Sequence, residues 1–187
     1  MKALTDTDFK EAADSIGCTV AVVKAVKEVE SNGKGFLPDG QPAILFEAHK
    51  FSEFTNGQYD RSHPTISSSR WNKRLYKGGV AEHVRLVNAS ALNRDAALKS
   101  ASWGLFQIMG FNWRLCGYSS LQAFINAMYR SEGEQLKAFI GFVKSQRLDR
   151  HLRNLNWAKF AEGYNGSAYK ENKYDTKLAA AYKKYLN

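Results

Sequence analysis

The segment from Thr19 to Glu30 constrains the fold more than any other part of the chain, because it combines an apolar stripe with a carboxylic acid. Four valines follow the i, i+1, i+4, i+7 spacing of one helix face: Val22, Val23, Val26 and Val29. Glu30 lies four residues after Val26 and therefore belongs to the same face. The glycine-containing run that starts at Ser31 ends the helix at this point.

Glu30 is predicted to hold its proton near neutral pH. A carboxylic acid at the inner end of an apolar face loses water, and this desolvation raises its pKa. A general acid must carry its proton at the working pH, so the position suits that role. The alternative is a glutamate at a helix end whose side chain turns to solvent.

Composition indicates one folded domain. The chain has 187 residues, of which 44% are hydrophobic and 13% aromatic, enough for a core. It has no apolar run long enough for a transmembrane helix, and the first six residues lack the apolar region of a secretory signal. Cys18 and Cys116 are too few for a disulfide framework, and two buried thiols are the simpler expectation.

The formal net charge of +9 and the sequence pI near 9.5 indicate a polyanionic partner. Nucleic acid, an anionic membrane surface and a cell wall all fit this balance. The basic residues are spread along the chain and form no long basic arm. Charge alone therefore predicts attraction to an acidic partner without choosing among these three.

The order of patterns predicts a mainly α fold, of the α+β class, with one loop-rich lobe at 33–76. Turn residues dominate this lobe, and 43–46 is its strand candidate. Helical patterns precede it at 6–15 and 19–30, and they resume near Val80 and continue almost to the end. Within that last part, helix starts are predicted at Ser119 or Ser120, Ser131 and Asn156, and the final amphipathic stretch spans 170–186.

Two further segments carry polar residues in unusual places. The segment 102–110 is apolar nearly all round and is predicted as a buried helix, in which Ser102 and Gln107 need hydrogen-bond partners. The segment 160–166 ends a helix at Gly163 and continues into a polar turn. Taken singly, the first is a core helix and the second a helix cap.

In this order, three segments together resemble the lysozyme superfamily, and especially goose-type lysozymes and soluble lytic transglycosylases. These are a helix that ends in Glu30-Ser31, the run Gly-Leu-Phe-Gln-Ile-Met at 104–109, and Ala-x-x-Tyr-Asn-Gly at 161–166. Shorter blocks at 35–37, 44–51 and 101–104 resemble the phage N-acetylmuramidase endolysin family. The likeness extends over nearly the whole chain, from about Ala21 to Ala181.

The resemblance implies a single catalytic domain over 1–187, with a lysozyme-like helical body and the 33–76 lobe beside the active-site cleft. It implies cleavage of the β-1,4 bond between N-acetylmuramic acid and N-acetylglucosamine in bacterial peptidoglycan. By motif match, Glu30 takes the role of the general acid that protonates the leaving glycosidic oxygen. No separate wall-binding domain is expected.

Hydrolysis of a glycosidic bond usually needs a second carboxylate. Glu47 is the first choice, because it follows the apolar run 43–46 and a strand would bring it to the edge of a cleft. Asp60 is the reserve, and Asp39 and Glu53 are further candidates in the lobe. The alternative for Glu47 is a structural pairing with His49, Lys50 or Arg61, and Thr55 is a weaker candidate for positioning a water.

The remaining groove residues follow from the matched positions. Ser102 and Gln107 are expected to bind sugar groups or to orient Glu30, and Met109 to pack on a sugar face. Tyr164 is expected close to Glu30, and Asn165 is expected to hold an N-acetyl group. Three aromatic residues could supply stacking surfaces for sugars: Trp103, Phe36 and Trp71. For Trp103, packing in the core is at least an equal alternative, and Trp71 lies in no matched motif.

No pattern predicts a metal or a cofactor. The four histidines lack ligand spacing, and neither cysteine stands in a nucleophile context. The expected protein is a monomer that binds no nucleic acid. It would be made in the cytoplasm of a bacterial host and released to the periplasm and cell wall by a separate protein.

Two other functions remain open. A lytic transglycosylase needs the acid but no second carboxylate, and it forms a 1,6-anhydro product. A non-enzymatic cationic protein could contact the wall or the anionic outer membrane through the basic C-terminal stretch. The alternative for that stretch is that its tyrosine- and leucine-rich face packs on the core.

Overall fold

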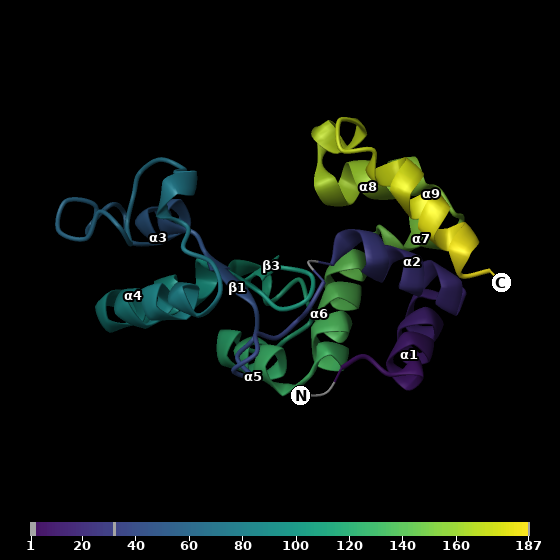
Figure 1. Ribbon diagram of the computed structural model, residues 1–187, viewed down its shortest axis with the longest axis horizontal. Coiled ribbons are helices and arrows are strands. Elements are labelled where there is room, and N and C mark those ends of the chain that lie inside the picture. Colours follow the sequence, from purple (N-terminus) through teal and green to yellow (C-terminus); the bar gives the residue numbers. More distant parts are fainter. Residues whose placement is uncertain (1–2, 32, 187) are drawn as a thin grey trace.

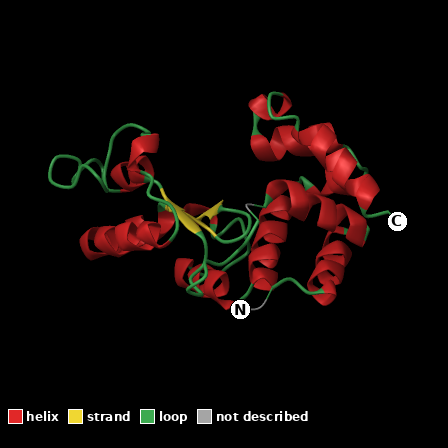
Figure 2. Cartoon of the chain, viewed as in Figure 1, coloured by secondary structure: helices red, strands yellow, loops and turns green. Residues whose placement is uncertain are grey.

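The computed structural model describes residues 3–31 and 33–186, and it consists of a helical body, a smaller lobe and a sheet between them (Figure 1). Helices predominate, and the strands are short (Figure 2). The fold is mainly α with a small β part, as predicted. The elements in chain order are α1 (Asp6–Ile16), α2 (Val20–Glu30), β1 (Ile44–Phe46), α3 (Ala48–Phe54), η1 (Lys73–Leu75), α4 (Val80–Lys99), β2 (Ala101–Trp103), β3 (Ile108–Met109), η2 (Gly110–Asn112), α5 (Leu121–Arg130), α6 (Glu132–Ser145), α7 (Asp149–Arg153), α8 (Trp157–Asn165), η3 (Ser167–Lys170) and α9 (Tyr174–Lys184).

The helical body is assembled around the valine stripe of α2. Val22, Val23 and Val26 are each at most 2% exposed, and α2 packs against α1 and α9. The turn from α1 to α2 passes through Gly17, whose φ of 78° is left-handed and therefore suits glycine. Three of the four valines of the predicted stripe are thus buried and Val29 is half-buried, and the stripe leads directly to Glu30.

The smaller lobe contains α3, the long α4 and the loops between them, and it lies beside the sheet (Figure 1). The sheet is antiparallel in the order β1-β2-β3, with Leu45 opposite Ser102 and Ser102 opposite Met109. Inside α4 the helix is kinked, because Asn93 has φ −156° and ψ 100° and its side chain accepts a hydrogen bond from the Ala96 amide. The lobe therefore joins the body through a sheet that both parts share.

The prediction of a buried helix at 102–110 is wrong. The segment is a hairpin of β2 and β3, and its turn uses left-handed φ angles of 70° at Gly104 and 50° at Gln107. The sequence pattern misled because a hairpin buried on both faces is apolar all round, as a buried helix is. The predicted need of Ser102 and Gln107 for partners holds in either conformation.

Most predicted helix starts agree with the structure. Ser120 caps α5, Ser131 caps α6 and Asn156 caps α8, each through a side-chain oxygen that accepts a backbone N–H. The last amphipathic stretch divides into η3 and α9, so its long helix begins at Tyr174. Both cysteines are free: Cys116 is buried, whereas Cys18 is only half-buried.

The C-terminal helix α9 packs on the outer side of α2. Leu178 is fully buried and Ala181 is 6% exposed, and the Trp157 and Tyr182 rings lie 5.5 Å apart. At the surface, Lys184 and Tyr185 both contact the Glu28 carboxylate, at 2.8 and 2.6 Å. The apolar face of the helix is therefore part of the core.

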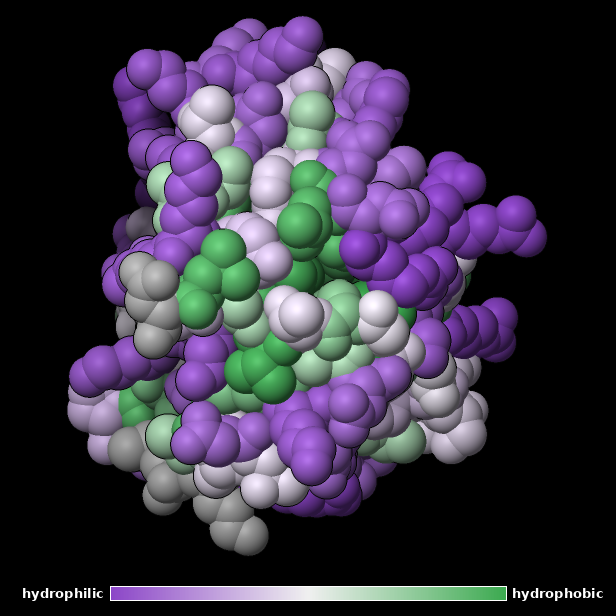
Figure 3. Space-filling model, turned by 90° about the vertical axis from the view of Figure 1, so that its right-hand side faces the viewer, coloured by the Kyte–Doolittle hydropathy of each residue, from purple (hydrophilic) through white to green (hydrophobic). Residues whose placement is uncertain are grey.

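The face that carries this helix is mostly hydrophilic around a small apolar patch (Figure 3). Among residues 3–31 and 33–186, no helix is long and apolar enough to cross a membrane.

We expect Leu178→Ala to lower the free energy of unfolding by about 2–5 kcal/mol, because it removes a fully buried side chain between α9 and α2. Leu186→Ala is the matched control, since Leu186 is 58% exposed, and it should change that free energy by less than about 0.5 kcal/mol. Urea denaturation followed by circular dichroism measures both values. Equal stability of the two variants would contradict the packing of α9 on the core.

Candidate active site

Glu30 is the last residue of α2 and is partly buried at the end of the valine stripe. Burial raises its pKa from an ordinary value of 4.5 to about 7, against the opposing effect of one hydrogen bond from Asn165. In that bond the Asn165 Nδ2 donates to Glu30 Oε1 at 3.0 Å. The site therefore contains a carboxylic acid that is about half-protonated at neutral pH.

Helix α8 brings two of the predicted residues to Glu30. Asn165 is its last residue and Tyr164 precedes it, and the helix ends at Gly166, whose φ is 80°. The Tyr164 ring stacks on Phe160 at 5.8 Å and meets Phe139 edge-on at 5.3 Å. Burial, and then the nearby Glu30 carboxylate, raise the pKa of Tyr164. Apolar aromatic packing thus forms one side of the environment of Glu30.

Ser102 and Gln107 bind each other inside the sheet. The Ser102 hydroxyl donates to Gln107 Oε1 at 2.8 Å, and Gln107 Nε2 donates to the carbonyl oxygens of Ala43 and Gly104 at 3.2 and 2.8 Å. Ser102 is only 6% exposed. The hydrogen bonds of Gln107 therefore join the hairpin to Ala43, the residue before β1. Met109 lies opposite Ser102, in β3.

A pocket of about 450 Å³ lies between the loop that follows α2 and the edge of the sheet. Gln107 lines it together with Gly33, Lys34, Phe36, Leu37, Pro38, Ala43, Ile44, Leu45 and Gly79. Phe36 is 8% exposed and pairs with Pro42 as an isolated bridge. Trp103 does not line the pocket: it is 1% exposed, and its indole N–H donates to the Leu98 carbonyl, so core packing holds for this residue.

Glu47 lies at the junction of β1 and α3, in a separate cluster from Glu30. Its side chain is 15% exposed, and Oε2 accepts a hydrogen bond of 2.7 Å from the Tyr76 hydroxyl. His49 Nδ1 lies 3.2 Å from the same oxygen, and Tyr76 in turn accepts a hydrogen bond from the Trp71 indole. The predicted contact of Glu47 with His49 is therefore present, beside an aromatic partner that was not predicted.

The other carboxylates of the lobe have local partners. Asp60 accepts from the hydroxyls of Ser52 and Ser67, at 3.0 and 2.5 Å. Asp39 accepts from the backbone and side chain of Gln41, and Glu53 pairs with Lys50 at 2.7 Å. Thr55 is 6% exposed and donates to the Phe51 carbonyl. These contacts stabilise turns and helix ends.

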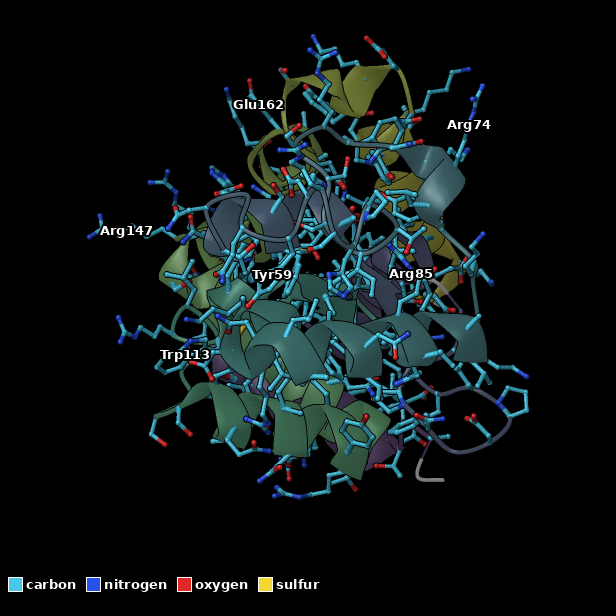
Figure 4. All side chains as sticks on the ribbon, turned by 90° about the vertical axis from the view of Figure 1, so that its left-hand side faces the viewer. Tyr59, Arg74, Arg85, Trp113, Arg147 and Glu162 are labelled. Atoms are coloured by element: carbon cyan, nitrogen blue, oxygen red, sulfur yellow. The ribbon has the colours of Figure 1, made fainter. Side chains whose placement is uncertain are left out.

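Two buried polar residues that were not predicted bond the backbone of the loops beside the site. Gln135 in α6 is 1% exposed and bonds Gly35, Leu105 and Met128. Glu82 in α4 is fully buried and pairs with Arg85 at 2.8 Å. Figure 4 shows Arg85 within the outline of the molecule, whereas Arg74 and Arg147 reach out from its edges.

The same signal that identified Glu30 was present for both residues. Each lies on the apolar face of its own helix, Gln135 beside Leu136 and Phe139, and Glu82 three and four residues before Arg85 and Leu86. Among residues 3–31 and 33–186, histidine, cysteine and carboxylate side chains form no group of three that could hold a metal ion.

The fold and this site are those of a lysozyme-like protein: a mainly helical body, a small sheet, and a desolvated glutamic acid at the end of a helix. The family model for N-acetylmuramidase matches residues 19–186, and the chain belongs to this family. It is therefore a glycoside hydrolase that acts on peptidoglycan, and the resemblance drawn from the sequence is confirmed.

Comparison with solved structures supports the same assignment. The crystal structure of a Burkholderia AP3 phage endolysin matches with 45% sequence identity and a TM-score of 0.92. The match covers 99% of this chain and 72% of the endolysin chain. No curated protein matches the chain.

We expect Glu30→Gln to be more stable than the wild type by up to about 3 kcal/mol above pH 7, and equally stable near pH 4. Burial raises the folded-state pKa above the unfolded value, so the wild type loses stability as the pH rises from 4.5 to about 7. Glutamine cannot ionise and escapes this loss. Urea denaturation at several pH values measures the difference.

Glu171→Gln is the control for this experiment, because Glu171 is exposed and its substitution should leave the pH dependence unchanged. A Glu30→Gln variant whose stability follows that of the wild type at every pH would contradict the desolvation of Glu30.

Proposed function

We propose that this muramidase hydrolyses the β-1,4 bond between N-acetylmuramic acid and N-acetylglucosamine with Glu30 as the general acid. The pKa of about 7 carries the proposal, because an acid that is half-protonated near neutral pH can give a proton to the leaving oxygen. Asn165 would hold the Glu30 carboxyl group in place. Activity should then fall as the pH rises through about 7.

Glu47 is the proposed second carboxylate. Its Oε2 binds Tyr76 and His49, and the side chain has no lysine or arginine partner among the described residues. Both carboxylate oxygens of Asp60 and of Asp39 accept hydrogen bonds, and Glu53 is paired with Lys50. The described contacts of the Glu47 carboxylate involve Oε2 alone, which favours Glu47 over the other three. A second carboxylate either activates water or stabilises the positive charge that develops on the sugar.

The groove residues take supporting roles in this proposal. Ser102 and Gln107 would act through the sheet that they hold together, and Gln107 Oε1 keeps a lone pair that can accept from a sugar hydroxyl. Met109 and Tyr164 would contribute apolar surface. Asn165 would bind an N-acetyl group of the substrate with its side-chain amide, which bonds Glu30 in the free protein. A single catalytic domain and a monomeric state stay predictions.

The biological role proposed is that of an endolysin, by analogy with the phage endolysin that the chain resembles. The protein would reach the cell wall of its host after release by a separate protein. The net charge of +9 would favour adsorption to the anionic envelope. Contact of α9 with the outer membrane would involve only the lysines of its outer face, because its apolar face is buried.

The products of purified peptidoglycan test the reaction, by mass spectrometry of soluble fragments from the wild type and Glu30→Gln. We expect hydrated fragments that end in reducing muramic acid with the wild type, and a loss of at least about 100-fold in their rate with the variant. Fragments lighter by one water would instead identify a lytic transglycosylase. Products that are equally abundant with Glu30→Gln would contradict the role of Glu30.

We expect Glu47→Gln to lower kcat by at least about 100-fold, because the uncharged amide can neither activate water nor stabilise a developing cation. Glu53→Gln is the matched control, since the Glu53 side chain is 58% exposed and pairs with Lys50, and the variant should retain wild-type activity. Release of soluble fragments over time measures both. A fully active Glu47→Gln variant that forms anhydro products would favour the transglycosylase.

A further inference from the structure

The loop that precedes α4 places two aromatic residues in a directed chain of hydrogen bonds that ends on Glu47. Trp71 Nε1 lies 2.8 Å from the Tyr76 hydroxyl oxygen, which lies 2.7 Å from Glu47 Oε2. An indole N–H can only donate, so the Tyr76 oxygen accepts from Trp71. The single hydroxyl proton of Tyr76 is therefore directed to the Glu47 carboxylate.

One buried ion pair sets the distance between Tyr76 and Glu47. Directly after Tyr76, the amides of Lys77 and Gly78 donate to Glu82 Oε1 at 2.6 and 3.1 Å. The amide of Phe46, the residue before Glu47, donates to Glu82 Oε2 at 3.1 Å. Tyr76 is thus next to Lys77, and Glu47 is next to Phe46, and the amides of Lys77 and Phe46 are both bonded to the Glu82 carboxylate.

The anchoring carboxylate is rigidly held. Glu82 is fully buried, and Arg85 bonds both its Oε2, at 2.8 Å, and the Phe46 carbonyl, at 3.0 Å. Burial alone would raise the pKa of Glu82, but the three amides and Arg85 outweigh it and keep that pKa below its ordinary value. The amide of Glu47 itself donates to the Ser100 carbonyl at 3.0 Å. Both ends of the Tyr76–Glu47 contact are therefore fixed by backbone bonds.

We propose that Tyr76 is a positioning residue for the reaction: it binds Oε2 of Glu47, fixes the plane of the carboxylate and leaves Oε1 free for water or sugar. This inference rests on the proposed role of Glu47 as the second carboxylate. The hydroxyl stays a donor throughout the working pH range, because burial and the Glu47 carboxylate raise the pKa of Tyr76 to about 12. Preorganised support of this kind is what a carboxylate in a catalytic site requires.

The position of Tyr76 fits a role in the site better than a role in the core. Its side chain is only half-buried, and the partner that directs its proton, Trp71, is 61% exposed. A hydrogen bond between partly solvated groups contributes little to folding. A second tyrosine of the same lobe offers the contrast, because Tyr59 donates to the Leu92 backbone carbonyl at 3.1 Å.

The test compares Tyr76→Phe with Tyr59→Phe, each of which removes one hydroxyl and keeps the ring. We expect Tyr76→Phe to lower kcat on purified peptidoglycan by about 10-fold, the effect of one hydrogen bond, and to leave KM within about twofold. Its pH–rate profile should also change, because the hydroxyl that the variant removes is bonded to the proposed second carboxylate. Tyr59→Phe should leave kcat and the pH profile unchanged.

Glu47→Gln separates the inference from the function on which it rests. If this variant is inactive, Tyr76→Phe should reduce its residual rate no further when the two changes are combined, because both act on one carboxylate. A Tyr76→Phe enzyme with the wild-type kcat and pH profile would overturn the positioning role, as would a full additional loss in the double variant. A fully active Glu47→Gln enzyme would instead overturn the role proposed for Glu47.

Discussion

The arrangement of the body and the sheet depends on one buried amide, that of Gln135. Its Oε1 accepts the Leu105 amide at 2.7 Å, and its Nε2 donates to the carbonyls of Gly35 and Met128. A Cβ atom added at Gly35 or Gly104 would clash with this side chain, so a larger residue at either position would displace Gln135 from its bonds. Because both polar atoms of the Gln135 side chain are bonded, its loss would take a partner from the Leu105 amide and the Met128 carbonyl, whereas the Gly35 carbonyl would keep its bond from the Ala43 amide. The loop that follows Glu30 and the hairpin therefore keep their places through one residue of α6.

Glu82 joins backbone segments of the lobe by hydrogen bonds, as Gln135 joins the body to the hairpin. It ties the end of β1 to the loop before α4, while Gln135 ties the start of the 33–43 loop to the hairpin. Gln135 bonds the loop that follows Glu30, and Glu82 bonds Phe46, the residue before Glu47. The environments of the two proposed catalytic carboxylates, Glu30 and Glu47, differ. Burial at the end of the valine stripe favours the protonated form of Glu30, whereas Glu47 has the Tyr76 hydroxyl and His49 as neighbours. Such a difference lets two chemically identical side chains act as acid and as carboxylate.

Local patterns predicted most of the helices, the caps of α5, α6 and α8, and the burial of Glu30, because each depends on residues only a few positions apart. Helix α3 was not predicted, since it lies in the segment 33–76 that turn residues dominate, and Thr19 precedes α2 without a side-chain cap bond. The hairpin at 102–110 was predicted wrongly, since a segment buried on all sides shows no periodicity that separates strand from helix. The partners of Gln135 and Glu82 could not be predicted, because they lie up to 100 and 36 residues away along the chain. That these residues needed partners could have been inferred, since each stands on an apolar helix face as Glu30 does. Tyr76 gave no such sign, because only the folded loop brings it to Glu47.

The stability of the protein and its chemistry make opposite demands on Glu30. A fully solvated glutamate would avoid the desolvation cost at neutral pH, yet it would have lost its proton and could not act as an acid. The packing of Tyr164 and the valine stripe keeps water away and raises the pKa, while Asn165 limits the rise through one hydrogen bond. Without that bond, desolvation alone would act on the carboxyl group and its pKa would lie higher still. The working pH of the acid is therefore set by a balance between apolar packing from α2 and α8 and one amide at the end of α8.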